Sequence, residues 1–190
     1  MRIVSGRWKG KALVAPAGET TRPTSDRARQ AVFNILEHAS WSPGLNGARI
    51  LDLFAGTGAL GLEALSRGAA SCLFLDTDPA ARAALMTNIE ACGAMGITRV
   101  WKRDAACLDP MPASANGPFD VVFVDPPYAK GFDVAALIGL ARGWLAPEGV
   151  IMLERGRGEG ALESGDFEVV DTREYGAAQV VLLVVNKKSS

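Results

Sequence analysis

The stretch DLFAGTGALG, residues 52–61, carries glycines at positions 56, 58 and 61. This G-x-G-x-x-G spacing is typical of the first strand–helix turn of a Rossmann-like sheet, where an adenosine-containing ligand approaches the backbone closely. Gly56 and Gly58 permit positive φ angles, and Gly61 permits tight packing of helix on strand. The spacing therefore predicts an adenosine ligand at this turn, and it fits a nicotinamide cofactor as well as any other.

From residue 49 onward, short apolar runs alternate with helical patterns, which is typical of a parallel sheet with helices on both faces. After five such strands, two more are separated only by a turn, so the C-terminal edge is expected to be an antiparallel hairpin with the last strand beside the fifth. The predicted fold class is therefore α/β, Rossmann-like, with a mostly parallel seven-stranded sheet. The expected strands cover residues 49–55, 71–76, 98–104, 119–127, 149–155, 167–176 and 178–186, and the expected helices cover residues 59–68, 79–93 and 133–145.

The N-terminal segment has a different pattern. Two short strands are expected at about residues 2–4 and 11–15, joined by a turn that contains glycine and lysine. This pattern predicts a small β-hairpin. The domain organisation that follows is a basic N-terminal hairpin and linker over residues 1–24 and one α/β domain over residues 25–190.

Charge is distributed unevenly along the chain. Residues 1–30 carry a net charge of +5 and the remaining residues carry −6, although the whole chain carries only −1. A basic segment on an otherwise acidic protein predicts contact with a polyanion such as RNA, and a solvated basic arm is the alternative. The candidate RNA-contacting side chains in this segment are Arg7, Lys9, Lys11 and Arg27.

The composition argues against several classes of protein. Cys72, Cys92 and Cys107 are far apart and form no C-x-x-C pair, so neither a disulfide framework nor a zinc site is expected. His38 is the single histidine, which leaves almost nothing for a metal site or a His-based triad. Because the chain has no long apolar run and no signal-peptide pattern at its N-terminus, a cytoplasmic location without a membrane partner is expected.

Asp52 is the first residue that discriminates between cofactors. A carboxylate aimed into a pyrophosphate site would repel the ligand, whereas S-adenosylmethionine (SAM) carries an ammonium and a sulfonium group that a carboxylate attracts. The alternative role for Asp52 is to cap a helix or close a turn. The predicted SAM-contacting residues are Asp52, Phe54, Gly56 and Gly58 in the turn, Asp76 near the ribose hydroxyls, and Asp104 near the adenine amino group, with turn closure as the alternative for Asp104.

The motif DPPY, residues 125–128, is the second discriminator and directly follows an apolar strand. Pro126 and Pro127 stiffen the loop, so that the Asp125 carboxylate and the Pro126 carbonyl form two neighbouring acceptors. Such a pair matches an exocyclic NH₂ group, which offers two donors, and it favours the pyramidal geometry of an attacking nitrogen. Tyr128 can stack on the base. An ordinary rigid turn is the alternative, which the SAM-type glycine turn earlier in the chain disfavours.

Taken together, these motifs resemble a class I SAM-dependent methyltransferase of the amino-methylating kind. The order and spacing of RIVSGRWKGKALVAP, TRPTSDRARQAVFNIL, LDLFAGTGALGLEALSRGA and FDVVFVDPPY resemble the bacterial RsmD family of 16S ribosomal RNA guanine-N2 methyltransferases, over about residues 2–185. The TRPTSDRAR segment is the family-specific part. There Arg22 and Thr24 are further candidates for RNA binding, where they would order the cofactor or the target loop, and a helix-start turn with a surface arginine is the alternative. The family pattern has a glutamate where this chain has Gln30, and usually a glutamate where it has Asp76.

The resemblance implies direct transfer of the SAM methyl group to N2 of one guanine in 16S rRNA, within a small ribosomal subunit or its assembly intermediate. The target base would have to be unstacked and rotated into the site. No metal or covalent intermediate is required.

Four other functions remain open from the sequence. An adenine-N6 methyltransferase acting on DNA or RNA would use DPPY equally well. A glutamine-N5 methyltransferase is disfavoured because such enzymes carry asparagine first in the tetrad. An NAD-dependent oxidoreductase would leave Asp52 and DPPY unexplained, and a SAM-binding assembly factor without activity would not require an intact target motif.

Overall fold

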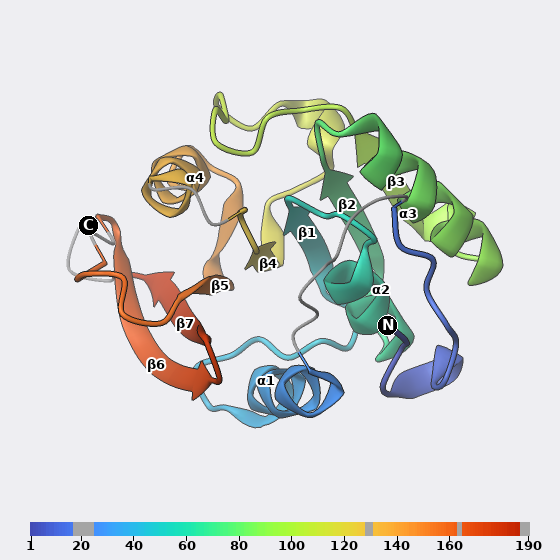
Figure 1. The fold of residues 1–190 in the computed structure, drawn as a ribbon. Coiled ribbons are helices and arrows are strands. Elements are labelled where there is room, and N and C mark those ends of the chain that lie inside the picture. The colour runs from blue at the N-terminus through green and yellow to red at the C-terminus, as the bar shows by residue number, and fades with distance from the viewer. Residues whose placement is uncertain (17–24, 128–130, 163–164, 187–190) are drawn as a thin grey trace.

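The computed structural model describes residues 1–16, 25–127, 131–162 and 165–186. Its centre is a seven-stranded sheet in the order β3-β2-β1-β4-β5-β7-β6 (Figure 1). The strands are β1 (Arg49–Leu53), β2 (Ser71–Leu75), β3 (Thr98–Trp101), β4 (Phe119–Val124), β5 (Leu145–Gly156), β6 (Phe167–Tyr175) and β7 (Ala178–Val185). The helices are α1 (Asp26–His38), α2 (Ala59–Ser66), α3 (Pro79–Ala91) and α4 (Phe132–Leu140), with short 3₁₀ turns η1 (Gly6–Trp8), η2 (Met95–Ile97) and η3 (Ala113–Ala115).

Strands β1 to β5 pair in parallel, and β7 pairs antiparallel to both β5 and β6. This confirms the predicted sheet and its antiparallel edge, including the insertion of the last strand beside the fifth. The β6–β7 hairpin joins the sheet at the free edge of β5, where the very apolar β7 gains a neighbour on each side.

The two faces of the sheet are covered by different helices. On one face, Ile50 of β1 packs in a cluster with side chains of α1, α2 and α3, while Leu51 packs in the cluster of the opposite face with α4. Successive residues of a strand point to opposite faces, so the unbroken apolar runs in the central strands match a sheet that is covered on both sides.

The predicted N-terminal β-hairpin is wrong. Backbone hydrogen bonds join the two arms, from Ile3 N–H to the Lys11 carbonyl (2.9 Å) and from Leu13 N–H to the Met1 carbonyl (3.0 Å). Within residues 1–16 these arms form one isolated antiparallel bridge, between Arg2 and Ala12, around the turn η1, and the pairing does not extend into strands. The reason is a competing partner: the Glu63 side chain in α2 accepts hydrogen bonds from the backbone N–H groups of Val4 (2.7 Å) and Ser5 (2.9 Å). A segment whose amides bond to a side chain elsewhere cannot use them for a strand ladder.

Helix α1 begins where a hydroxyl group can cap it. The Ser25 side chain accepts a hydrogen bond from the backbone N–H of Ala28 at 3.1 Å.

Within the described ranges, no helix is both long and apolar enough to cross a membrane.

Candidate active site

The glycine turn after β1 has the backbone geometry that its sequence predicts. Gly56 and Gly58 have φ angles of +54° and +77°, and Phe54 between β1 and this turn also has a positive φ of +58°. A Cβ atom added to Gly58 would lie 2.3 Å from the Leu85 side chain, whereas one added to Gly56 would meet nothing closer than 4.0 Å. Gly58 is thus needed for packing, and Gly56 leaves open space in which a ligand can approach the backbone.

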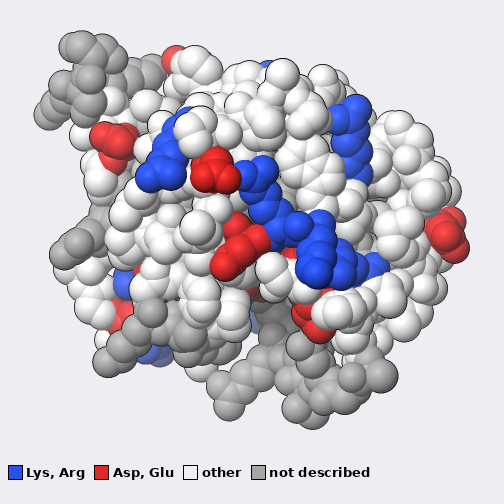
Figure 2. Space-filling model, turned by 90° about the horizontal axis from the view of Figure 1, so that it is seen from above, with Lys and Arg blue, Asp and Glu red and all other residues white. Residues whose placement is uncertain are grey.

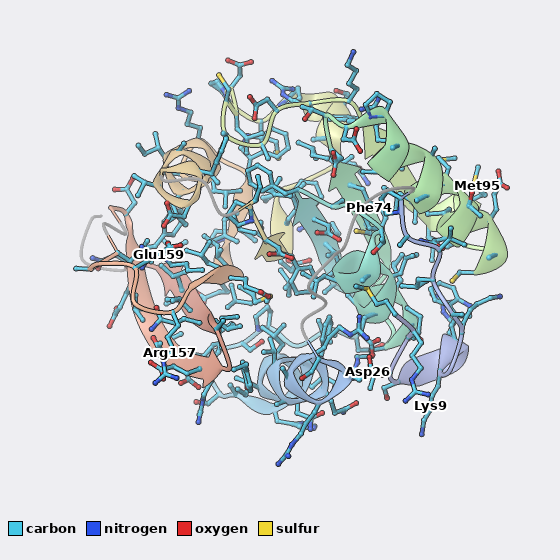
Figure 3. The ribbon with its side chains drawn as sticks, viewed as in Figure 1. Lys9, Asp26, Phe74, Met95, Arg157 and Glu159 are labelled. Atoms are coloured by element: carbon cyan, nitrogen blue, oxygen red, sulfur yellow. The ribbon has the colours of Figure 1, made fainter. Side chains whose placement is uncertain are left out.

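The buried core beneath the turn requires the third glycine. A Cβ atom on Gly61 would lie 2.4 Å from the Phe74 ring and 2.7 Å from the Cys72 sulfur. Phe74 lies on β2, next to the turn (Figure 3). Gly61 therefore allows α2 to pack directly on the sheet.

Asp52 lies in the interior of the protein at the start of α2. Asp52 is only 2% exposed, and its Oδ2 atom accepts a hydrogen bond from the backbone N–H of Gly61 at 2.9 Å. Burial raises the pKa of Asp52 well above its usual range, the Gly61 hydrogen bond opposes this, and the charges of Asp125 and Asp76 raise it further. The carboxylate thus holds the N-terminal turn of α2, as the capping alternative describes, and a SAM contact stays a prediction.

Asp76 follows β2 and is held by two backbone amides. Oδ2 accepts from the N–H of Gly56 and Oδ1 from the N–H of Asp78, each at 2.8 Å. These bonds fix the carboxylate against the glycine turn, where a ribose would lie in a Rossmann-like site. Asp104 is exposed and accepts from the N–H of Ala106 at 2.9 Å, which is the turn-closing arrangement given above as its alternative.

Asp125 and the two prolines follow directly after β4. Asp125 has an exposed edge, yet the surrounding protein desolvates its carboxylate; this desolvation and the charge of Glu154 raise the pKa of Asp125 to about 7. Pro126 is half-buried and Pro127 is exposed. Tyr128, Arg22 and Thr24 lie outside the described residues.

The glycine turn and Asp125 meet at the switch point of the sheet. Leu53 of β1 is the register partner of Val124 of β4, so the residues that follow these two strands emerge side by side. The strand order reverses between β1 and β4, and ligands in open α/β sheets bind at the carboxyl ends of the strands at such a point. The glycine turn and the segment that begins with Asp125 therefore lie at the same end of the sheet.

Comparison with known proteins identifies the family. The model of the family described as conserved hypothetical protein 95 matches residues 1–184. Ribosomal RNA small subunit methyltransferase D of Escherichia coli is 40% identical over 156 residues, covering 81% of this chain and 74% of that protein. The chain belongs to the RsmD family.

Two further relatives cover nearly the full length of the chain. YlbH of Bacillus subtilis, named as a candidate rRNA methyltransferase, is 36% identical over 185 residues, covering 96% of this chain and 97% of that protein. The solved structure of the Escherichia coli yhhF protein superposes with a TM-score of 0.82, at 34% identity over 98% of both chains. The resemblance to the RsmD family inferred from the sequence motifs is thus confirmed.

Two site features of this RsmD family member were missed by the sequence reasoning. Glu154, near the end of β5, is only 7% exposed and acts electrostatically on Asp125. Arg155 forms an ion pair with Asp133 at 2.9 Å in which both side chains are about one-tenth exposed, and this pair joins the start of α4 to β5. The sequence signal for these features was two charged residues, Glu154 and Arg155, after an apolar strand. The same pattern is typical of a strand end exposed to solvent.

A ring contact joins the two halves of the site. Phe132, the first residue of α4, lies edge-on to Phe54 with ring centroids 6.0 Å apart. The segment that contains the DPPY motif therefore starts at β4 and ends at a helix that contacts the glycine turn.

The predicted RNA-contacting side chains of the N-terminal segment differ in their surroundings. Arg7 lies over the Trp8 ring at 4.4 Å and donates to the Leu65 carbonyl, and Lys11 donates to the Ala91 carbonyl. Lys9 and Arg27 are exposed; Lys9 lies at the periphery of the molecule (Figure 3). RNA binding by these residues stays a prediction.

The face of the molecule shown in Figure 2 has a row of basic side chains, bordered by acidic ones.

Replacing Gly58 tests the steric requirement of the turn. Gly58→Ala is expected to lower the free energy of unfolding by about 2–5 kcal/mol, because it adds a clash with Leu85 to an unfavourable positive φ. Gly93→Ala is the matched control, because Gly93 also has a positive φ, +64°, but a Cβ there would meet nothing within 4 Å. It should cost only about 1–2 kcal/mol. Equal losses in urea denaturation would show that contact with Leu85 contributes nothing.

Proposed function

We propose that this protein transfers a methyl group from SAM to the exocyclic N2 amino group of a guanine in small-subunit ribosomal RNA. The observation that carries the proposal is the meeting of the glycine turn with Asp125 and Pro126 at the β1–β4 switch point. A cofactor site without a target motif would support only binding. The combination supports group transfer to an amine.

The residues of the turn fit SAM. Open space at Gly56 leaves room for the ligand beside the backbone, and the fixed Asp76 carboxylate can accept hydrogen bonds from ribose hydroxyls. The carboxyl groups of Asp52 and Asp125 lie close to this site, and they fit a ligand with ammonium and sulfonium groups better than one with a pyrophosphate. SAM, when bound, supplies an already activated methyl group.

The chain's own residues then have to position the target amine. The Asp125 carboxylate and the Pro126 carbonyl each accept one N–H of the amino group, which turns the nitrogen lone pair toward the methyl carbon. Much of the acceleration comes from holding the two reactants in this orientation. Stacking by Tyr128 is predicted to add roughly 1–3 kcal/mol to binding of the base.

Small-subunit rRNA as the substrate is supported by two independent observations. The Escherichia coli relative is named for methylation of ribosomal RNA of the small subunit. The basic N-terminal segment of this chain adds exposed Lys9 and Arg27, and phosphate contacts by such residues supply much of the affinity for RNA.

Transfer of labelled methyl groups tests this function. The protein is incubated with labelled SAM and small ribosomal subunits from cells that lack its gene, and the RNA is digested to nucleosides. Label is expected in N2-methylguanosine. Label in adenosine would favour the adenine-N6 alternative, and label in protein would refute RNA as the substrate. Subunits from cells that keep the gene are the control, because their target should already be methylated and take up little label.

A further inference from the structure

Glu154 lies beside Asp125 at the carboxyl end of the sheet. Strands β4 and β5 are parallel, with Phe123 opposite Met152 and Val124 opposite Leu153. One residue further along both strands, this register places Asp125 next to Glu154. Because side chains of a strand alternate, both carboxylates lie on the same face as Phe123 and Met152. Two acids from different strands therefore converge at the proposed target site.

The side chains around this pair are mostly acidic. Asp52 lies on the same face at the end of β1, and Asp76 follows β2. Arg155, the basic residue next to Glu154, forms an ion pair with Asp133 of α4 and another with Glu159. In the helices that cover this face, Arg29 bonds to Asp26, and Arg67 bonds to Glu63 and Glu37. These three arginines thus have acidic partners other than Asp125.

Methylation of an amine releases a proton. The nitrogen lone pair forms the new N–C bond while the S–C bond breaks and its electron pair goes to sulfur. The nitrogen becomes positively charged and must lose one N–H proton before a neutral methylamino group results. A carboxylate already bonded to that N–H is placed to take the proton and pass it to solvent.

We propose that Glu154 is a positioning residue for this proton transfer: its carboxylate, beside Asp125, makes Asp125 a proton acceptor as well as a hydrogen-bond acceptor. The inference rests on the proposed function. It agrees with the pKa of about 7 for Asp125, to which desolvation contributes most and Glu154 next. A carboxyl group with an ordinary pKa would be a weak base near neutral pH.

The pH dependence of methyl transfer tests the role of Glu154. With both substrates below their KM values, kcat/KM of the wild-type protein should fall as the pH drops through about 7, because Asp125 becomes protonated. At pH 6 it should reach about one-tenth of its plateau. In Glu154→Gln the inflection should move to lower pH, so that a larger share of that variant's own plateau remains at pH 6 than in the wild type. The plateau itself should fall, since a less basic Asp125 accepts the proton less readily.

Two variants separate charge from structure. Glu154→Asp keeps the negative charge and should retain an inflection near 7, whereas Glu159→Gln removes a half-exposed acid from the same end of β5 and should leave the profile unchanged. An inflection that stays at the same pH in Glu154→Gln would overturn the inference. If wild-type protein transfers no methyl group to the particles, the proposed function has failed. A second measurement, described next, still decides whether Glu154 acts on the protonation of Asp125.

That second measurement needs neither substrate nor mutation. In wild-type protein labelled with ¹³C in its carboxyl groups, the NMR signal of Asp125 should titrate near pH 7, and the signal of Glu154 should shift in the same step. Titration of Asp125 near pH 4, or a Glu154 signal that ignores the Asp125 step, would refute the coupling even if methyl transfer is observed.

Discussion

Asp125→Ala is expected to lower kcat for methyl transfer by about 100- to 1,000-fold, the usual effect of removing one group that stabilises charge in a transition state. The reason is geometric: the Pro126 carbonyl would remain, but the amino group would lose its second acceptor. Single-turnover assays with labelled SAM measure this effect.

The same variant should still bind SAM. Asp125 keeps an exposed edge, so loss of its charge should change the Kd for SAM by no more than about fivefold. Asp166→Ala, which removes an exposed aspartate just before β6, is the matched control and should leave both quantities unchanged. If the variant lost affinity for SAM but kept normal turnover, Asp125 would contact the cofactor and not the target amine.

Glu63→Ala is expected to lower the free energy of unfolding by about 3–5 kcal/mol. Glu63 is 0% exposed, and besides the two N-terminal amides it binds Arg67 Nε at 2.8 Å. The Arg67 side chain is only 3% exposed, so the variant would leave a buried guanidinium with Glu37 as its remaining acidic partner. Chemical denaturation followed by circular dichroism measures the change.

Two comparisons make this prediction specific. Glu90→Ala removes an exposed acid of α3 and should change the stability by at most about 0.5 kcal/mol. Replacing both partners, as in Glu63→Leu with Arg67→Met, should recover part of the loss, because it removes the uncompensated charge. A Glu63→Ala variant as stable as Glu90→Ala would mean that the hydrogen bonds and the ion pair of Glu63 contribute nothing to the stability.

The sheet could be predicted because its determinants are local. Apolar runs in β1 to β5 and β7, and the turns between them, mark the strands within a few residues. The place of the last strand beside the fifth was predicted from the C-terminal hairpin, whereas the order of the parallel strands was not predicted. The glycine turn could also be predicted from the spacing of its glycines. Gly58 and Gly61 are required there because a Cβ atom at either position would clash with its neighbours.

The features that sequence reasoning missed depend on contacts between distant residues. Ser5 and Glu63 are 58 positions apart. Nothing in the sequence of residues 1–16 indicates that the backbone amides of Val4 and Ser5 bond to a distant side chain. Glu154 is a similar case, because an acid at a strand end becomes a buried neighbour of Asp125 only once β4 and β5 are paired in register. Local patterns predict elements, whereas the pairing of charges requires the assembled fold.

The attachment of the N-terminal segment to α2 has a consequence for synthesis on the ribosome. Val4, Ser5 and Trp8 bind side chains of Glu63 and Ser66, which are made about sixty residues later. The first residues to emerge therefore cannot dock until the helix after the glycine turn exists, and closing so long a loop costs entropy that only the finished contacts offset. During translation this basic segment stays undocked until the glycine turn and helix α2 have been synthesised.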